Sequence, residues 1–358
     1  MAHSFVPGPV DVDHKILQAQ AQPMLPHRSS DYEKIFHQAE AKARVLFGTQ
    51  DRVLISASSG TGLQEAAVRN LAQTDVLSCV NGAFGNRWHQ VALSNGKNAD
   101  KLEIPWEQPI TASAVHDALA KKEYEIITIV HNETSTGMAN PIAEIASAVH
   151  KISPDALICV DAVSSLGGAP IKMEAWGLDF VLTSSQKALA LPPGLALGAV
   201  SNRALERAAT VTNRGWYFDI LRLENARIKN STPATSAVSL VYALDQQLDR
   251  ILEEGLDNRF ARFQSLAERI HQWALACGFG LYAPEGYRSR TVTTVSNYRD
   301  IDVSALLAYL LERDLRIANG YGPLKGKTFR IAHMGETTMG DVEMLLATID
   351  EFLAKPAD

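Results

Sequence analysis

The sequence predicts an α/β protein with a large domain on a mostly parallel sheet and a smaller α+β domain at the C-terminal end. From about residue 53 to residue 200, short runs of apolar and β-branched residues alternate with amphipathic helical stretches. Strands that are apolar at nearly every position are typical of a parallel sheet with helices on both faces. The length of 358 residues, of which 46% are hydrophobic, suits two domains with sizeable cores.

Each expected element follows from its own local pattern. Strands are expected at 53–56, 75–80, 126–130, 156–160, 180–183 and 195–200, the last being a candidate for an antiparallel position. Helical patterns cover 62–71, 86–93, 112–120 and 142–152. A long helix over 235–277, broken near Glu254-Gly255, is expected to join the two domains. Strands at 291–297 and 329–332 with helices at 303–313 and 339–353 complete the small domain.

The predicted large domain covers residues 16–254, and the small domain covers 255–358 together with the N-terminal segment 1–15. Prolines at positions 7, 9, 23 and 26 exclude continuous regular structure in the N-terminal region, which we expect to cross toward the small domain.

The composition excludes several classes of function. The net charge is −6 and the Lys and Arg residues are scattered, so no nucleic-acid or membrane partner is expected. No charged N-terminal region precedes an apolar run, and no run of 18 apolar residues occurs, so we expect a cytoplasmic protein. The three cysteines have no metal-ligand spacing, and no metal site is predicted.

The most informative segment is FVLTSSQKALALPPG, residues 180–194, in which a strand end is followed by a single lysine, Lys187. An amine held in a partly apolar pocket has a lowered pKa and is a good nucleophile toward carbonyl groups. A second strand ends in Asp161, and a buried carboxylate there calls for a cationic partner. A carbonyl-trapping lysine beside a strand-end aspartate indicates pyridoxal phosphate chemistry.

Three loops at other strand ends supply further candidates. Ser59, Gly60 and Thr61 precede a helix, whose free N–H groups and dipole favour a single phosphate group. In NGAFGNR, Phe84 is placed where it can stack on a flat ring, whereas Arg87 is expected to be structural. In the loop after residue 130, the hydroxyl of Thr134 is a candidate for a cofactor oxygen, and Glu133 is interpreted as a structural carboxylate.

Taken together, several motifs resemble those of the class V aminotransferases, in the family's order and over nearly the whole chain. They are PGP…PHRS, SSGTG, NGAFGNR, ETSTG, VDAVSSLGG and SSQKAL. The sequence is most similar to the alanine–glyoxylate and serine–pyruvate or serine–glyoxylate branch. The resemblance implies the aspartate-aminotransferase-like fold, pyridoxal 5'-phosphate as cofactor, and a homodimer with shared active sites.

The resemblance also implies roles for individual residues. Lys187 would hold the cofactor as a Schiff base, Asp161 would pair with the ring nitrogen, and Phe84 and Val163 would pack on the two ring faces. The phosphate would be bound by Ser59, Gly60, Thr61 and Gln186, and by Thr232 and Thr235 of the neighbouring subunit. Arg330 in FRIA would bind the substrate α-carboxylate, and Gly8 and Arg28 are further candidates for substrate binding.

The predicted reaction moves an amino group from a small amino acid, alanine or serine, to a 2-oxo acid such as glyoxylate or pyruvate, by a ping-pong mechanism. Phosphoserine transamination with 2-oxoglutarate remains an alternative, because His27-Arg28 also occurs in related phosphoserine enzymes. A cysteine desulfurase is less favoured. Those enzymes typically have a histidine before the Schiff-base lysine and a catalytic cysteine late in the chain, whereas here Gln186 precedes the lysine and no cysteine follows Cys277. His333 and Glu336 are expected either at the substrate entrance or in a solvated loop.

Overall fold

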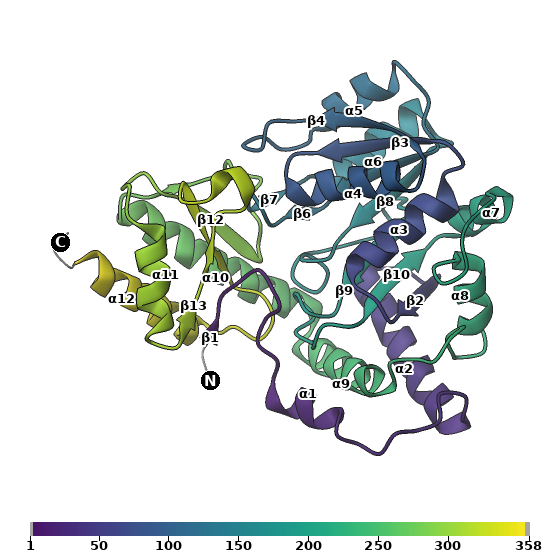
Figure 1. Ribbon diagram of the computed structural model, residues 1–358, viewed down its shortest axis with the longest axis horizontal. Coiled ribbons are helices and arrows are strands. Elements are labelled where there is room, and N and C mark those ends of the chain that lie inside the picture. Colours follow the sequence, from purple (N-terminus) through teal and green to yellow (C-terminus); the bar gives the residue numbers. More distant parts are fainter. Residues whose placement is uncertain (1–2, 355–358) are drawn as a thin grey trace.

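The computed structural model describes residues 3–354 and consists of a large and a small lobe, each built on its own sheet (Figure 1). The large lobe contains a seven-stranded sheet in the order β2-β10-β9-β8-β5-β3-β4. Its strands are β2 (Arg52–Ser56), β3 (Asp75–Val80), β4 (Asn98–Glu103), β5 (Ile126–Val130), β8 (Leu157–Asp161), β9 (Phe180–Ser184) and β10 (Ala196–Val200). In this sheet only β10 is antiparallel to its neighbours. This strand corresponds to residues 195–200, which the sequence marked as a candidate for an antiparallel strand.

Helices cover both faces of this sheet, which confirms the predicted α/β class. One face carries α1 (His14–Ala19), α2 (Ser30–Phe47), α5 (Ala112–Leu119), α6 (Ile142–Ile152) and α9 (Val238–Glu254). The other carries α3 (Gly60–Leu71), α4 (Ala83–Ser94), α7 (Asn202–Thr210) and α8 (Ile220–Arg227). The strands are buried at almost every position, as expected of a sheet that contacts helices on both sides.

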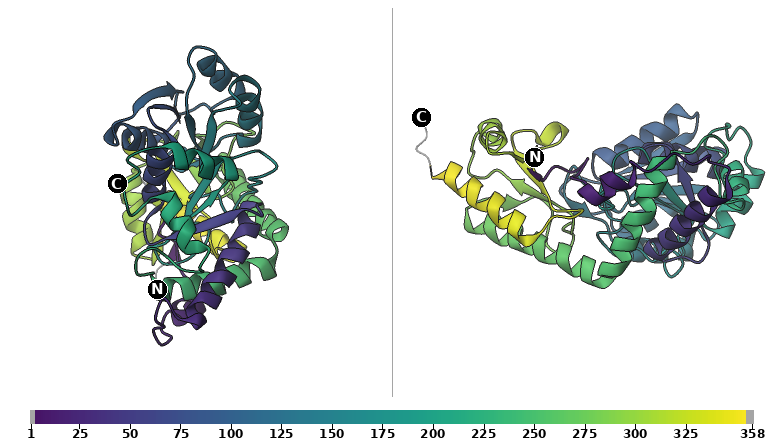
Figure 2. Two further views of the ribbon diagram at one scale, coloured as in Figure 1. Left: turned by 90° about the vertical axis from the view of Figure 1, so that its right-hand side faces the viewer. Right: turned by 90° about the horizontal axis from the view of Figure 1, so that it is seen from below.

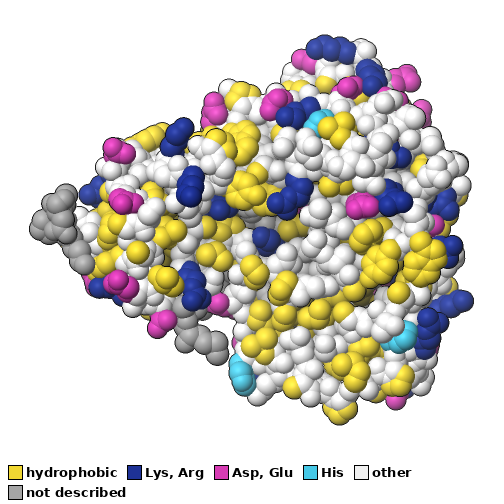
Figure 3. All heavy atoms as spheres, in the orientation of Figure 1, with side chains coloured by type: hydrophobic (Ala, Val, Ile, Leu, Met, Phe, Trp, Pro, Cys, Tyr) yellow, Lys and Arg dark blue, Asp and Glu magenta, His cyan; other side chains and the backbone are white. Residues whose placement is uncertain are grey.

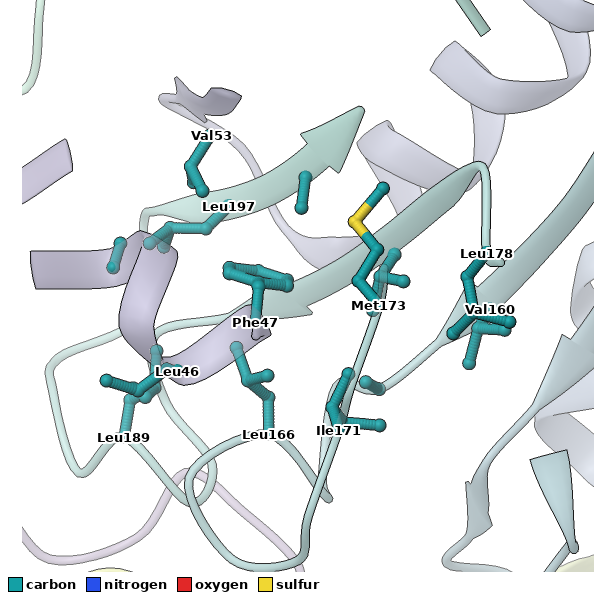
Figure 4. Close-up of a cluster of buried hydrophobic side chains, with 14 of the residues drawn as sticks. Leu46, Phe47, Val53, Val160, Leu166, Ile171, Met173, Leu178, Leu189 and Leu197 are labelled. Carbon is teal, nitrogen blue, oxygen red and sulfur yellow. The ribbon is translucent and has the colours of Figure 1, made fainter. Parts of the chain in front are cut away.

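On the face of the sheet that carries α2, buried hydrophobic side chains gather around the end of that helix (Figure 4). Phe47 is fully buried and points between Leu197 of β10 and Leu166 (Figure 4). Burial of such a side chain contributes about 1.5–3 kcal/mol. Gly48 then ends the helix with φ 62°, a left-handed conformation that glycine adopts without strain. These contacts fix α2 against the sheet edge formed by β2 and β10.

The small lobe contains a four-stranded sheet in the order β11-β12-β15-β14. Its elements are β11 (Gly280–Leu281), β12 (Val292–Ser296), β14 (Ala318–Asn319), β15 (Thr328–Ala332), the 3-10 helix η1 (Gly322–Leu324), and helices α10 (Leu256–Ala276), α11 (Val303–Leu311) and α12 (Met339–Leu353). The chain's first strand, β1 (His3–Ser4), pairs in parallel with β13 (Leu315–Arg316). Phe5 is part of the small lobe's core, so the N-terminal segment reaches that lobe as expected.

The chain passes between the lobes along the N-terminal segment and again where α9 meets α10. The predicted break near Glu254-Gly255 is present: α9 ends at Glu254, Gly255 has φ 80°, and α10 continues along the small lobe (Figure 2). A short hairpin of β6 (Asn132–Glu133) and β7 (Met138–Ala139) projects from the large lobe. The domain boundary between residues 254 and 255 stays a prediction, and its outer limits at residues 1 and 358 lie outside the described residues. Within residues 3–354, no helix combines the length and apolar character needed to cross a membrane.

Candidate active site

The carboxyl ends of β5, β8 and β9 meet at one edge of the large sheet, and a cavity of about 190 Å³ lies there. It brings together many of the residues predicted from sequence: Ser59, Gly60, Thr61, Phe84, Thr134, Asp161, Val163, Gln186 and Lys187. Figure 3 shows that the surface is hollowed where the two lobes meet and that Lys and Arg side chains border this hollow. Ligands of open α/β sheets bind at this position relative to the strands.

Lys187 is held inside the cavity by the N-terminal segment. Its Nζ donates a hydrogen bond to the carbonyl oxygen of Pro7, and a Cβ added to Gly8 would lie 2.6 Å from its Cδ. Burial lowers the pKa of Lys187 to about 8, and the nearby guanidinium of Arg330 acts in the same direction, while Asp161 opposes them. A measurable fraction of the amine is therefore unprotonated near neutral pH, which is what a nucleophilic lysine requires.

Asp161 ends β8 and is almost completely buried. Its Oδ1 accepts a hydrogen bond from the N–H of Val163 at 2.8 Å, and its Oδ2 accepts one from Nε2 of Gln64 at 2.6 Å. Both contacts come from neutral donors, and no ion pair to Asp161 occurs within residues 3–354, so the cationic partner expected for this carboxylate stays a prediction. Burial raises the pKa of Asp161 to about 6, and the two hydrogen bonds work against this rise.

The sequence analysis did not identify Gln64. It lies one helical turn after Gly60 on α3 and lines the cavity beside Asp161. A glutamine on an amphipathic helix gives no pattern that marks it as functional. The only available signal was its spacing from the SSGTG loop, which places it on the same side of the helix as the helix start.

The helix start at Ser59–Thr61 has the properties of an anion site. Helix α3 begins at Gly60, two residues before the predicted start, and its N-cap Ser59 makes no side-chain capping bond. The N–H of Gly62 donates to the carbonyl oxygen of Ser59, but those of Gly60 and Thr61 remain available, and the helix dipole favours an anion there. A Cβ at Gly60 would lie 2.6 Å from Cγ2 of Val163, so glycine allows the helix to approach the end of β8 closely.

Phe84 borders the cavity from the start of α4. Its ring centroid lies 5.7 Å from that of Tyr321 in the small lobe, and the guanidinium carbon of Arg87 lies 4.8 Å from the centroid of the Phe84 ring. The buried carboxylate of Glu133 accepts hydrogen bonds from the backbone N–H groups of Phe84 and Gly85. Glu133 therefore fixes the loop that carries Phe84, in line with its structural interpretation, whereas Arg87 lines the cavity.

Arg330 approaches the cavity from β15. Its Nε donates to the carbonyl oxygen of Asn319 at 3.0 Å, and its Nη1 donates to that of Thr134 at 3.2 Å. Burial lowers the pKa of this guanidinium. Arg330 and Gly8 do not form the wall of the cavity itself, but their contacts with Thr134 and Lys187 place them at its border.

Three predicted residues lie elsewhere in this single chain. Thr232 and Thr235 line a different cavity, together with the half-exposed Trp216 and Tyr217. Arg28 is exposed, and its Nε hydrogen-bonds to the imidazole of the adjacent residue. Within one chain none of the three reaches the cavity around Lys187, so their predicted contacts with the cofactor or the substrate stay predictions.

Neither His333 nor Glu336 lines the cavity around Lys187. His333 is fully buried and its Nε2 lies 3.1 Å from Oγ1 of Thr293. Glu336 forms ion pairs with Arg250 and Arg259. His333 is therefore in neither of the two expected places, whereas Glu336 lies in a turn with a partly exposed side chain, which agrees with the loop alternative.

The cavity has the chemistry required by a flat phosphorylated heterocycle that carries an aldehyde. It offers an amine, a carboxylate, an aromatic ring and an uncapped helix start in one space. Three buried polar atoms at its wall have no hydrogen-bond partner: Oγ of Ser184, Oε1 of Gln64 and Oδ1 of Asn132. Unpaired buried polar atoms are rare, and a bound polar ligand satisfies them. The residues present therefore fit pyridoxal 5'-phosphate.

Comparison with known proteins gives consistent results. The family model described as aminotransferase class V matches residues 12–338. The chain is 34% identical to L-aspartate–glyoxylate aminotransferase of Paracoccus denitrificans, over 98% of this chain and 90% of that protein. It is 33% identical to serine–glyoxylate aminotransferase of Methylorubrum extorquens, over 93% of this chain and 86% of that protein.

Solved structures show the same similarity. The crystal structure of alanine–glyoxylate aminotransferase from Nostoc sp. superposes with a TM-score of 0.93 at 28% identity, covering 98% of this chain and 95% of that one. The likeness therefore extends over both lobes.

Proposed function

The chain belongs to the class V aminotransferases, and from this membership we propose that it is a pyridoxal-phosphate-dependent transaminase that transfers the amino group of a small amino acid to glyoxylate or a similar 2-oxo acid. The observation that carries the proposal is the cavity shared by Lys187 and Asp161. The named relatives, which use glyoxylate, support the acceptor.

In this proposal, Lys187 would bind the coenzyme covalently, and Asp161 would pair with its ring nitrogen. Phe84 and Val163 would contact the two faces of the ring, and the hydroxyl of Thr134 would bind an oxygen of the coenzyme. The start of α3 and Gln186 would hold the phosphate. When bound, the coenzyme supplies an electron-withdrawing ring that stabilises negative charge at the substrate Cα.

The protein's own groups bind the substrate and move its proton. Lys187 Nζ, unprotonated in part near neutral pH, would take the proton from the substrate Cα as a base and then deliver it, as an acid, to the coenzyme carbon that carried the aldehyde. Asp161 would keep the ring nitrogen protonated. Arg330 binds the α-carboxylate, for which a guanidinium provides two parallel donors.

The donor is proposed to be a small amino acid, alanine or serine. The phosphoserine and cysteine desulfurase alternatives are not favoured by the named relatives. A side-by-side assay with alanine, serine, aspartate and phosphoserine, each with glyoxylate and 2-oxoglutarate, distinguishes these donors.

We also propose a homodimer in which Thr232 and Thr235 of one subunit complete the phosphate site of the other. Support comes from their separation from Lys187 within one chain and from the large hydrophobic side chains exposed beside them, Trp216 and Tyr217. Sedimentation of the purified protein tests the assembly: a monomer at micromolar concentration with full activity contradicts it.

The experiment that tests the function combines absorbance with activity. The purified protein should show the visible absorbance of a covalently bound coenzyme and transaminate glyoxylate. Lys187→Ala should lose both, with turnover lower by at least about 10³-fold, since it removes both the attachment point and the base. Lys97→Ala is the matched control, because Lys97 is also partly buried but donates to the carbonyl oxygen of Ala72. Full activity of Lys187→Ala overturns the assignment.

A further inference from the structure

We propose that Gln64 is a positioning residue for the coenzyme, whose side-chain amide keeps Asp161 ionised and oriented toward the ring nitrogen. This inference rests on the proposed function and assigns a role to a residue that the motif resemblance leaves without one. The role is exerted through Asp161, and Gln64 itself need not touch the substrate.

The contact between the two side chains is short and shielded from water. Nε2 of Gln64 lies 2.6 Å from Oδ2 of Asp161, and Gln64 is only 2% exposed. The other carboxylate oxygen accepts the N–H of Val163. One donor on each oxygen fixes the plane of the carboxylate, and each oxygen retains a free lone pair for a further donor.

The orientation of the amide follows from its surroundings. If the amide were turned over, its Oε1 would face the carboxylate, and two acceptors would lie at hydrogen-bond distance from one another. The nitrogen must therefore point to Asp161. Oε1 then remains without a partner at the wall of the cavity.

Gln64 also connects the elements that would contact the other parts of the coenzyme. It lies on α3, whose start at Gly60 is the proposed phosphate site. Its backbone carbonyl accepts a hydrogen bond from Nε1 of Trp88 at 3.1 Å, and Trp88 belongs to α4, which carries Phe84. Gln64 therefore contacts α4 through its backbone and the end of β8 through its side chain.

The surroundings of Asp161 explain why a donor is needed. Burial raises the pKa of Asp161 to about 6, and the negative charge of Glu133 acts in the same direction. The hydrogen bonds from Val163 and Gln64 and the positive charge of Lys187 lower it. Removing the Gln64 donor leaves more Asp161 protonated near neutral pH, and a protonated carboxyl cannot hold the ring nitrogen in its cationic form.

The test compares Gln64→Met with Gln247→Met. Both changes replace a buried glutamine that donates to a carboxylate by an apolar side chain of similar length, but Gln247 contacts Glu336 in the small-lobe junction. The dissociation constant is measured for pyridoxal phosphate and for its analogue with carbon in place of the ring nitrogen. We expect Gln64→Met to weaken pyridoxal phosphate binding about tenfold, the loss of a hydrogen bond to a charged group.

The analogue separates positioning from packing. It has no ring nitrogen to pair with Asp161, so the wild type and Gln64→Met should bind it equally, and Gln247→Met should change neither affinity. If Gln64→Met weakens both ligands to the same extent, or neither, the proposal is overturned. A wild-type protein that does not bind pyridoxal phosphate overturns the proposed function, and this inference with it.

A second variant, Gln64→Asn, keeps the proposal testable if the methionine variant fails to fold. It retains an amide, but its side chain is one methylene shorter, so from the same backbone position it cannot reach Oδ2 of Asp161. Pyridoxal phosphate should bind about tenfold more weakly than to the wild type, and the analogue should bind equally. An asparagine variant that binds pyridoxal phosphate as tightly as the wild type contradicts the inference.

Discussion

Arg330 of the small lobe donates a hydrogen bond from Nη1 to the carbonyl oxygen of Thr134 in the large lobe, 3.2 Å away. A second hydrogen bond, from Nε to the carbonyl oxygen of Asn319, joins the guanidinium to β14 of the small lobe itself. The tip of the side chain is thus fixed by one carbonyl from each lobe. Nη2 has no hydrogen-bond partner within residues 3–354, so it remains available for a ligand.

Arg330→Lys should raise KM for both the amino donor and the 2-oxo acceptor by about tenfold or more, with a smaller change in kcat. A lysine keeps the charge but cannot bond Thr134, Asn319 and a carboxylate from one planar group. Steady-state kinetics in both directions give the two KM values. Arg316→Lys, at an exposed position on β13, is the control. Unchanged KM values for both substrates would show that Arg330 does not bind the substrate carboxylate.

Gly8→Ala should slow coenzyme attachment and lower kcat by about tenfold or more, because the added Cβ would lie 2.6 Å from Cδ and 2.8 Å from Nζ of Lys187. The rate of the absorbance change on adding coenzyme to the coenzyme-free protein measures attachment. Gly286→Ala is a matched control, since Gly286 has φ +85° against +92° for Gly8 but no atom within 4 Å of the added Cβ. Equal effects of the two changes would show that backbone strain alone is responsible.

The sheet was predictable because its strands are buried on both faces. Residues 75–80 and 126–130 are strands at the predicted bounds, and their burial requires the apolar character that marked them. Strand β4, Asn98–Glu103, was missed for the opposite reason. It is an edge strand with mostly exposed, polar residues, and its hydrogen bonds to β3 leave no pattern in the side chains.

Within the site, the sequence predicted which residues lie at the strand ends, but not which side chains form hydrogen bonds with one another. Lys187 and Asp161 follow apolar runs, and the parallel pairing of β8 with β9 brings the two strand ends together. The partner of Asp161 was unpredictable, because Gln64 comes from a helix whose packing angle decides what its side chain reaches. His333 was misjudged because its burial depends on the pairing of β12 with β15, which are far apart in sequence.

Glu133→Gln should lower the free energy of unfolding by about 2–3 kcal/mol and weaken coenzyme binding. The carboxylate accepts hydrogen bonds from the N–H groups of Phe84, Gly85 and Ser135 and from the hydroxyl of Ser135. An amide nitrogen placed in this ring of donors leaves at least one of them unpaired. Denaturant unfolding measures the loss, and Glu144→Gln at an exposed position of α6 is the control. A stability within 0.5 kcal/mol of the wild type, the usual range for surface changes, would contradict the structural role.

Lys187→Met should make the coenzyme-free protein more stable at pH 7, although it removes activity. The pKa of Lys187 is lowered by burial from 10.5 to about 8, so folding must accommodate a buried ammonium at neutral pH. Between pH 8 and 10.5 the unfolded chain binds more protons at this site than the folded protein, and the wild-type stability therefore rises with pH. Over that range the free energy of unfolding of the wild type should rise by up to about 3 kcal/mol, because the buried lysine no longer has to be charged.

The advantage of Lys187→Met over the wild type should thus be largest at pH 7, on the order of 1–2 kcal/mol once the lost hydrogen bond to Pro7 is allowed for, and should shrink toward pH 10. Urea unfolding of the coenzyme-free proteins at both pH values gives the difference. Lys151→Met, at an exposed position of α6, should show no such pH-dependent gain. A methionine variant less stable than the wild type at pH 7 would mean that Lys187 is well solvated, and the argument for a nucleophilic amine in this cavity would lose its physical basis.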